Sequence, residues 1–283
     1  MSETYGSALR KAIARLSEAG LDEARAEAKF LLLGACNMSS SDLILNEGEP
    51  IPEDSAARFE DFLQRRLRHE PVSLILGVTD FMGLSFLTDE RALAPRGDSE
   101  RLVEAALERA PQMAGKVVDL GTGSGCLLQS FLHERKGWTG TALDLSPDAL
   151  SLAKENAARL KLEDRITFLQ GSWATATDAI ADADIVISNP PYIRTEVLDE
   201  LDPEVREHDP MLALDGGADG LTAYRDIVSI CATVMKTGAW LLFEIGFDQA
   251  EEVSTIVSGH RFAELSRLKD YSGHNRVVLA RKL

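Results

Sequence analysis

Cysteine is scarce in this sequence, and its three cysteines do not cluster. Cys36, Cys126 and Cys231 lie far apart, and no CxxC motif occurs in the chain. Disulfide frameworks and structural zinc sites need cysteines at close, regular spacings. We therefore expect neither a disulfide nor a bound metal, and this cysteine usage is typical of a cytoplasmic protein.

Long apolar runs are also missing. The opening residues, MSETYGSALRKAIARL, lack the apolar segment that a signal peptide needs. The most apolar run, residues 30–36, is far shorter than the ~20 residues that cross a bilayer. We therefore expect a soluble cytoplasmic protein without a membrane partner.

Positive charge is the third scarce feature. The chain carries 30 Lys and Arg against 46 Asp and Glu, a net charge of −16 at pH 7. Proteins that grip a phosphate backbone usually carry a basic face. We interpret the one small basic cluster as a solvated helix end, and we expect no direct nucleic-acid binding. An acidic enzyme is still suited to a basic protein or a ribonucleoprotein. The cluster consists of Arg65, Arg66, Arg68 and His69.

The first part of the chain has a helical pattern. With 283 residues, 45% of them hydrophobic, the chain is long enough for one large or two smaller domains. Over residues 1–75, apolar positions recur at helical spacing, which predicts a helical domain. Helices are expected to begin near Ser41 and Pro52 and to stop at Gly20 and Gly34.

The rest of the chain has a different pattern. Residues 76–97 include GVTDFMGLSFLTDERALAPR, which predicts a β-hairpin linking two domains. Over 98–283, apolar strands alternate with helical stretches such as 147–160 and 220–235, which predicts a parallel sheet covered by helices. The expected strands are KVVDLG (116–121), GTALDLS (140–146), ITFLQG (166–171), ADIVISN (183–189), AWLLFEIG (239–246) and the closing RVVLARKL.

A glycine-rich loop follows the first of these strands. In VVDLGTGSGCLL, the residues Gly121, Gly123 and Gly125 lie between a strand and a helix, so the backbone can turn sharply and approach a ligand. The spacing is neither that of a dinucleotide fingerprint nor that of a P-loop. Asp119, just before the glycines, repels phosphate and suits a cationic ligand. A tight turn without a ligand has a similar pattern.

Asp144 and Trp173, which lie later in the chain, bear on the kind of ligand that the loop would bind. Asp144 follows Gly121 by 23 residues (144 − 121), close to where a doubly wound fold places the acid that holds ribose hydroxyls. The alternative is an aspartate that caps the helix beginning at Pro147. With the glycine loop, an adenosine-type ligand is favoured. Trp173 is suited to pack on an adenine face, or else it is a core tryptophan.

The stretch SNPPYIR closes the strand 183–189. Ligands of open parallel sheets bind at the carboxyl ends of strands, so Asn189 is expected in the same crevice as the glycine loop. The prolines fix φ and leave carbonyls free to accept, and Tyr192 supplies a flat wall. The Asn189 oxygen and the Pro190 carbonyl can each accept one N–H of a planar –NH₂ group. The alternative, a rigid Asn-Pro turn, is less favoured at this position.

These motifs resemble those of S-adenosylmethionine-dependent methyltransferases. The resemblance is closest to the HemK/PrmC-type protein-(glutamine N5) methyltransferases, which modify peptide chain release factors. It covers nearly the whole chain, through HEPVSLILGVTDFMGLSF, APRGDSERLVE, VVDLGTGSG, ALDLSPDAL, ISNPPYIR, ALDGGADGLTAYRDIV, LLFEIGFDQAEEV and KDYSGHNRVVLA. Several of these segments lie outside the general methyltransferase core.

The resemblance implies an α/β fold. A smaller N-terminal helical domain over 1–75 would help hold the release factor, and the β-hairpin 76–97 would lead to a seven-stranded, Rossmann-like class I methyltransferase domain over 98–283. The substrate would be the glutamine of a Gly-Gly-Gln loop. S-adenosyl-L-methionine would be the cofactor and S-adenosyl-L-homocysteine its product. We expect the enzyme to be a monomer.

The resemblance also assigns roles to residues. Asp144 would hold the ribose and Trp173 would lie near the adenine. The methionine part of the cofactor would be lined by Gly121, Thr122, Gly123, Ser124 and Gly125. Asn189, Pro190 and Tyr192 would be catalytic, with Asn189 also close to the cofactor. The substrate amide would be bound by Asn189, Pro190, Pro191 and Tyr192.

Two positions depart from the family pattern. Gly97 stands where the family usually has a second proline, which makes the loop beside the substrate less stiff. Ser172 stands where an acid often precedes the tryptophan. With serine there, the contact to the adenine amino group is lost, or a backbone group makes it in place of the acid.

The expected chemistry is direct in-line transfer, without a metal or a covalent intermediate. The histidines are isolated in sequence and are interpreted as structural or surface residues: His69, His133, His208, His260 and His274. Three alternatives stay open: an adenine-N6 nucleic-acid methyltransferase, a glutamine methyltransferase with another target such as a ribosomal protein, and a non-catalytic cofactor-binding scaffold.

Overall fold

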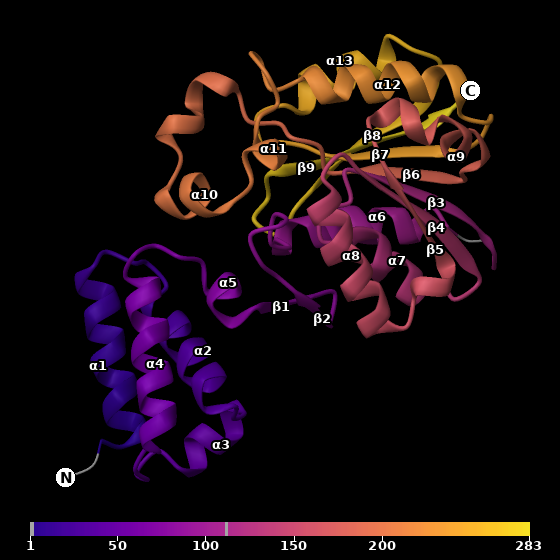
Figure 1. Cartoon of the computed structure of the whole chain (residues 1–283). Helices are drawn as coiled ribbons and strands as arrows, with labels where there is room; N and C mark the ends of the chain where they lie inside the picture. Colours follow the sequence, from indigo (N-terminus) through magenta and orange to yellow (C-terminus); the bar gives the residue numbers. More distant parts are fainter. Residues whose placement is uncertain (1–2, 111–112) are drawn as a thin grey trace. The chain divides into compact units, whose positions relative to one another are not determined.

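A computed structural model describes residues 3–110 and 113–283 of the chain (Figure 1). The chain divides into two compact units. The helical unit contains the residues up to Val78 together with the segment Pro203–His208. The sheet unit contains Thr79–Asp202 and Asp209–Leu283.

The domain ranges expected from the sequence stay predictions. The return of Pro203–His208 to the helical unit was not among them, because these residues lie inside the range expected for the methyltransferase domain. Within the described residues, no helix is long and apolar enough to cross a membrane.

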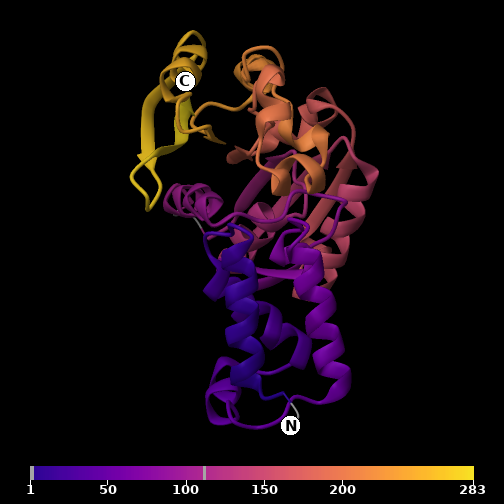
Figure 2. The ribbon, with the colours of Figure 1, turned by 90° about the vertical axis from the view of Figure 1, so that its left-hand side faces the viewer.

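The helical unit is built around one apolar core. Figures 1 and 2 show α1, α2 and α4 running alongside one another. Their inward faces supply fully buried residues such as Leu16, Leu31 and Leu32, in the spacing that an amphipathic helix requires. The helices are α1 Tyr5–Glu18, α2 Ala24–Cys36, α3 Ser40–Leu45, α4 Glu53–Arg66, α5 Val72–Leu76 and α10 Pro203–His208.

Local capping explains where these helices end. Ser39 and Asp42 form a reciprocal capping box at the start of α3. The predicted stop at Gly34 is wrong, because α2 continues to Cys36 and ends at Asn37, whose φ is 49°. Gly34 serves packing instead: a Cβ there would lie 2.4 Å from a methyl carbon of Leu76.

The basic cluster at the end of α4 is not a solvated helix end. Arg66 is only 2% exposed. Its guanidinium donates to both carboxylate oxygens of Glu27, at 2.9 Å each, and it also pairs with Glu204 of α10. Arg65 pairs with Glu70. The interpretation from sequence fails for Arg66 because this arginine pairs with acids that are distant in the chain.

The sheet unit confirms the predicted fold class. Its seven strands are ordered β5-β4-β3-β6-β7-β9-β8. The first five are mutually parallel, and β9 runs antiparallel to both of its neighbours. The strands are β3 Gly115–Leu120, β4 Trp138–Asp144, β5 Ile166–Gln170, β6 Ile185–Ser188, β7 Trp240–Glu244, β8 Phe262–Lys269 and β9 Asn275–Lys282.

Strand β8 was not predicted from the residues. It lies at the edge of the sheet, where Figure 2 shows the β8–β9 pair in yellow. Its sequence FAELSRLK carries three charged residues, and only Phe262 is fully buried. Charged side chains are common on edge strands and hide the apolar alternation that identifies a strand.

Helices cover both faces of this sheet (Figure 1). Alternate strand residues face opposite sides, so Val117 packs in one core cluster and Val118 in the other. One cluster includes residues of α6 Glu100–Glu108 and α7 Cys126–Glu134, and α8 Pro147–Leu160 lies on the same side. The other includes residues of α9 Thr177–Asp182, α12 Thr222–Val234 and α13 Ala250–Ser258. The central strands β3, β6 and β7 are thereby buried on both faces along most of their length.

The β-hairpin predicted within 76–97 is present as β1 Val78–Phe81 and β2 Leu84–Leu87. Asn156 of α8 ties it to the glycine loop. Its Oδ1 accepts from Leu87 N at 2.7 Å, and its Nδ2 donates to the carbonyl oxygens of Leu87 and Ser124 at 3.2 and 3.0 Å.

Candidate active site

The carboxyl ends of four neighbouring strands meet at one edge of the sheet. Leu120 of β3 is in register with Leu143 of β4 and with Ser188 of β6, and Ser188 is in register with Phe243 of β7. The residues that follow these positions therefore emerge together. The structure brings the predicted glycine loop, Asp144 and the Asn-Pro-Pro-Tyr turn to this one edge.

The glycine loop has the backbone that its sequence predicts. Gly121, Gly123 and Gly125 have φ values of 77°, 54° and 83°, in the left-handed region that glycine adopts without strain. The N–H groups of Gly121 and Thr122 both donate to the Leu143 carbonyl at 2.9 Å. The loop leads into α7, so the first N–H groups of that helix lie at this edge.

Asp144 holds the loop from the neighbouring strand. Its Oδ2 accepts from Gly123 N at 2.8 Å and its Oδ1 accepts from Ser146 N at 2.9 Å. The cap of α8 is Ser146, whose hydroxyl accepts from Ala149 N. Asp144 is therefore not the cap of that helix, and each of its oxygens retains a further lone pair.

Trp173 lies against the glycine loop. It opens the short 3₁₀ helix η3 Trp173–Ala176, and a Cβ built at Gly121 would lie 3.4 Å from its ring. The side chain is half-buried and packs against the core cluster below. The two interpretations of this residue are thus compatible, since one part of the ring contacts the core while another part borders the loop. Ser172, before it, is exposed.

The Asn-Pro-Pro-Tyr turn is supported by a second glycine loop. A Cβ at Gly216 would lie 2.8 Å from the Pro191 carbonyl oxygen, and one at Gly220 would lie 2.4 Å from that of Tyr192. Gln249 Nε2 donates to the same Tyr192 carbonyl at 3.0 Å. Reasoning from the residues alone missed this support, although ALDGGADGL contains an unusual density of glycine.

A cavity of about 670 Å³ opens beside Tyr192. It is bordered by the residues after the turn, by the second glycine loop and by the segment after β7. Its lining includes Ile193, Val197, Leu221, Phe247 and Gln249. The cavity therefore borders the carboxyl side of the Asn-Pro-Pro-Tyr turn.

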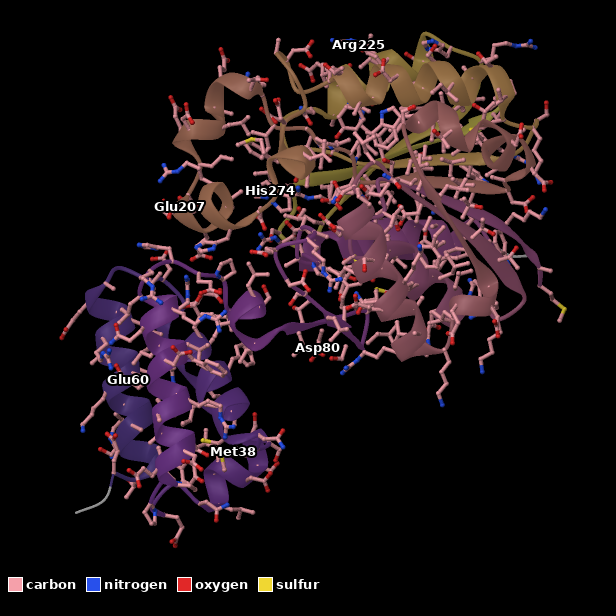
Figure 3. The ribbon with its side chains drawn as sticks, viewed as in Figure 1. Met38, Glu60, Asp80, Glu207, Arg225 and His274 are labelled. Carbon is pink, nitrogen blue, oxygen red and sulfur yellow. The ribbon has the colours of Figure 1, made fainter. Side chains whose placement is uncertain are left out.

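The loop that carries the Gly97 departure is fixed by ion pairs. Arg276 contacts Asp98 at 3.1 Å and Asp270 at 3.2 Å, and Arg96 contacts Asp209 at 2.8 Å. These pairs hold both sides of Gly97, so the loop has restraints that do not depend on a second proline. His274, labelled in Figure 3, lies in the turn between β8 and β9, and its backbone N–H donates to Asp270 Oδ1 at 2.9 Å.

Two buried acids lie beneath this edge. Burial raises the pKa of Asp119 to about 7, and the nearby Asp144 raises it further, while the hydrogen bond from Thr122 lowers it. Burial also raises the pKa of Glu244, at the end of β7, to about 7. The sequence offered a signal for Glu244 that was not used: an acid in FEIG at the carboxyl end of a buried strand.

The raised pKa of Asp119 predicts a pH-dependent effect of Asp119→Asn. An unfolded aspartate has a pKa near 3.9, so the folded protein takes up a proton that the unfolded chain lacks as pH falls below about 7. That contribution to stability is present at acid pH and is lost as pH rises through about 7. Because the unfolded carboxyl group is already mostly ionised at pH 5, the variant should be more stable than wild type by about 1–2 kcal/mol at that pH and by about 4 kcal/mol at pH 8.

Urea denaturation of both proteins at the two pH values measures this difference. Asparagine retains an oxygen that can accept from the Thr122 hydroxyl, which is 2.6 Å from Asp119 Oδ2. Asp164→Asn, at an exposed position, is the matched control. A stability difference that stays constant between pH 5 and pH 8 would contradict the burial of an ionisable Asp119.

The comparisons with known proteins agree with this geometry. The profile of the PrmC N-terminal domain matches residues 7–77, and that of the methyltransferase small domain matches residues 98–202. The catalytic domain of hMettl16, solved with the MAT2A 3'UTR hairpin 6, covers 81% of this chain and 81% of its own with a TM-score of 0.57. At 15% identity, that likeness bears on the fold alone.

Two curated relatives match over almost their whole length. The release factor glutamine methyltransferase of Caulobacter vibrioides is 39% identical over 283 residues, which are 100% of this chain and 98% of the relative. That of Cereibacter sphaeroides is 41% identical over 274 residues, 97% of each chain. The resemblance expected from the motifs is confirmed, and this chain belongs to the release factor glutamine methyltransferase family.

Proposed function

We propose that this protein transfers a methyl group from S-adenosylmethionine to the side-chain amide nitrogen of the glutamine in the Gly-Gly-Gln motif of peptide chain release factors. The observation that carries the proposal is the Asn-Pro-Pro-Tyr turn at the end of β6, next to the glycine loop that ends β3. The Asn189 oxygen and the Pro190 carbonyl, which can each accept one hydrogen of a planar –NH₂ group, thus follow the strand next to the one that leads into the glycine loop, which would hold the cofactor. The names of the full-length relatives support the same reaction.

The residues at the edge of the sheet fit the cofactor. Gly121, which has no Cβ, leaves room beside Trp173, whose ring suits an adenine. Asp144 has lone pairs suited to ribose hydroxyls. Within the described residues, Asp119 Oδ1 and Ser124 Oγ are buried without a hydrogen-bond partner, and buried polar atoms of this kind favour a polar, positively charged ligand nearby.

When bound, the cofactor supplies an electrophilic methyl group on a sulfonium. The chain's own residues then have two tasks. Asn189 and the Pro190 carbonyl accept the two N–H groups of the substrate amide and so orient its nitrogen, and Tyr192 forms a wall beside it. Such orientation is worth up to ~7–11 kcal/mol of the barrier. The segment after the turn is held by Gln249, so the turn keeps its position.

The remaining parts of the proposal concern partners. The helical unit helps to hold the release factor, and the cavity beside Tyr192 takes residues that flank the glutamine. The enzyme acts in the cytoplasm and as a monomer. The five proposed loop residues, Asp144 and Trp173 hold the cofactor, and the residues of the Asn-Pro-Pro-Tyr turn hold the substrate.

A methyl-transfer assay tests the reaction. Purified protein and labelled S-adenosylmethionine are incubated with a release factor, and in parallel with the same factor whose Gly-Gly-Gln glutamine is changed to alanine. We expect label on the first factor and not on the second. Label on both would mean that the site is elsewhere. Label on neither, with cofactor binding intact, would overturn the proposed substrate and lead to ribosomal proteins and nucleic acids.

A further inference from the structure

Asn156 of α8 is a fully buried amide that contacts the glycine loop. Its side chain makes three hydrogen bonds. The Oδ1 atom accepts from Leu87 N at 2.7 Å, and the Nδ2 atom donates to the carbonyl oxygens of Leu87 and Ser124 at 3.2 and 3.0 Å. One side chain thus joins the glycine loop to the last residue of β2.

The partners of Asn156 fix which way its carboxamide points. A backbone N–H only donates and a carbonyl oxygen only accepts, so the Asn156 oxygen must face Leu87 N and its –NH₂ group must face the two carbonyls. Both donors of the –NH₂ group are then used. Aspartate and leucine have a similar size but lack these two donors, so the arrangement is specific for asparagine.

The glycine loop needs such a restraint, because its own sequence makes it soft. Gly123 and Gly125, on either side of Ser124, both have positive φ, and glycine changes its backbone conformation with little penalty. The peptide plane between Ser124 and Gly125 is held at both ends. Asn156 holds the carbonyl, and Gly125 N donates to the Thr122 carbonyl at 2.8 Å. Without Asn156 one of these two restraints is lost.

Other restraints act on the first half of the loop. The carboxyl end of β4 accepts hydrogen bonds from the N–H groups of Gly121, Thr122 and Gly123. Asn156 holds the second half, which leads directly into α7 and so sets where the first N–H groups of that helix point. The two halves of the loop are therefore held by different elements, the first by a strand and the second by a helix.

We propose that Asn156 is a positioning residue that holds the second half of the glycine loop ready for the methionine part of the cofactor and couples it to the β-hairpin. This inference rests on the proposed function, in which the loop lines that part while Asp144 and Trp173 hold the adenosine. A loop that is ordered beforehand binds more tightly, because less conformational entropy is lost on binding. Loss of Asn156 should therefore weaken binding of the methionine part and affect the adenosine part little.

Two ligands that share the adenosine and a thioether sulfur test this role. S-adenosyl-L-homocysteine also carries the amino-acid part, whereas methylthioadenosine has a methyl group in its place. Calorimetry measures the dissociation constant of each for wild type and Asn156→Ala. The variant should bind S-adenosyl-L-homocysteine about tenfold more weakly, as expected when a buried carbonyl loses its partner, and methylthioadenosine within about twofold of wild type.

Val257→Ala is the matched control for a general loss of stability. Val257 of α13 is buried in the core cluster on the other face of the sheet, so its truncation lowers stability through lost packing. Both affinities should stay near those of wild type in this variant. A merely structural role of Asn156 would weaken both ligands by the same factor.

The link to the hairpin gives a second readout, in the wild-type protein. The Leu87 amide exchanges its hydrogen only when its bond to Asn156 opens, and a ligand that needs Asn156 in place makes this opening rarer. Saturation with S-adenosyl-L-homocysteine should slow exchange at Leu87 by about tenfold or more, relative to the Val253 amide of α13. Methylthioadenosine should leave this ratio nearly unchanged.

The outcomes separate this role from the proposed substrate. The expected ligand pattern in a protein that methylates no release factor would keep the positioning role and overturn the proposed substrate. Equal losses for both ligands in Asn156→Ala, or no loss, would overturn the positioning role. Wild type that binds neither ligand would overturn the proposed cofactor together with this role. If Asn156→Ala does not fold, an unchanged exchange ratio at Leu87 in wild type with S-adenosyl-L-homocysteine overturns it as well.

Discussion

Asn189→Ala should abolish most methyl transfer while leaving cofactor binding nearly intact. The side chain supplies one of the two acceptors that orient the substrate nitrogen, and alanine supplies none. The expected loss in kcat is about a thousandfold or more, because orientation acts on the reacting nitrogen in the transition state. Single-turnover methylation of a release factor measures the rate, and calorimetry measures the dissociation constant of S-adenosylmethionine.

Two comparisons make this result specific. Asn189→Ala should unfold at nearly the same temperature as wild type, because Asn189 is partly exposed and follows the last residue of β6. Thr237→Ala, at an exposed position before β7, should behave as wild type in both assays. Equal losses of turnover and of cofactor affinity would contradict a role in orienting the substrate, and would make Asn189 a cofactor residue.

Asp144→Ala should have the opposite signature, with a large loss of cofactor affinity. The carboxylate accepts the Gly123 N–H at 2.8 Å and so holds the glycine loop, and in the proposed function it also holds the ribose. Losing both tasks should raise the dissociation constant of S-adenosylmethionine by about ten- to a hundredfold or more. The kcat at saturating cofactor should change less than KM.

The conservative change separates the two tasks of Asp144. In Asp144→Asn, one oxygen remains to accept from Gly123, while the other acceptor becomes a donor, so the affinity should lie between those of wild type and alanine variant. Asp148→Ala, an exposed position in the first turn of α8, is the matched control. A cofactor affinity that is unchanged in Asp144→Ala would rule out its proposed contact to the ribose.

The sequence predicted most of the sheet unit because local chemistry determines it. The helix predicted over 147–160 matches α8 residue for residue, since a serine cap, a proline at the first position and regular apolar spacing all agree there. The glycine loop was predictable for a similar reason, as three positions with positive φ demand glycine.

What sequence reasoning missed depends on contacts between distant residues. The pairing of Arg66 with Glu27 and Glu204 spans up to 138 positions, and no local pattern signals it. The close approach of Gly216 and Gly220 to the Asn-Pro-Pro-Tyr turn follows from the packing of two loops. Glu244 was overlooked, although FEIG places an acid at the carboxyl end of a buried strand, because its nearness to the site appears only once β6 and β7 are paired.

The return of α10 to the helical unit means that this unit is not a continuous piece of the chain. Glu204 completes the set of acids around the buried Arg66, yet it lies 126 positions after Val78 (204 − 78). A fragment cut at Val78 leaves that guanidinium with one carboxylate fewer in a nearly dry place, which is an unfavourable environment for a charge. A chimaera that takes the complete helical unit from this protein must therefore carry two segments of the chain, not one.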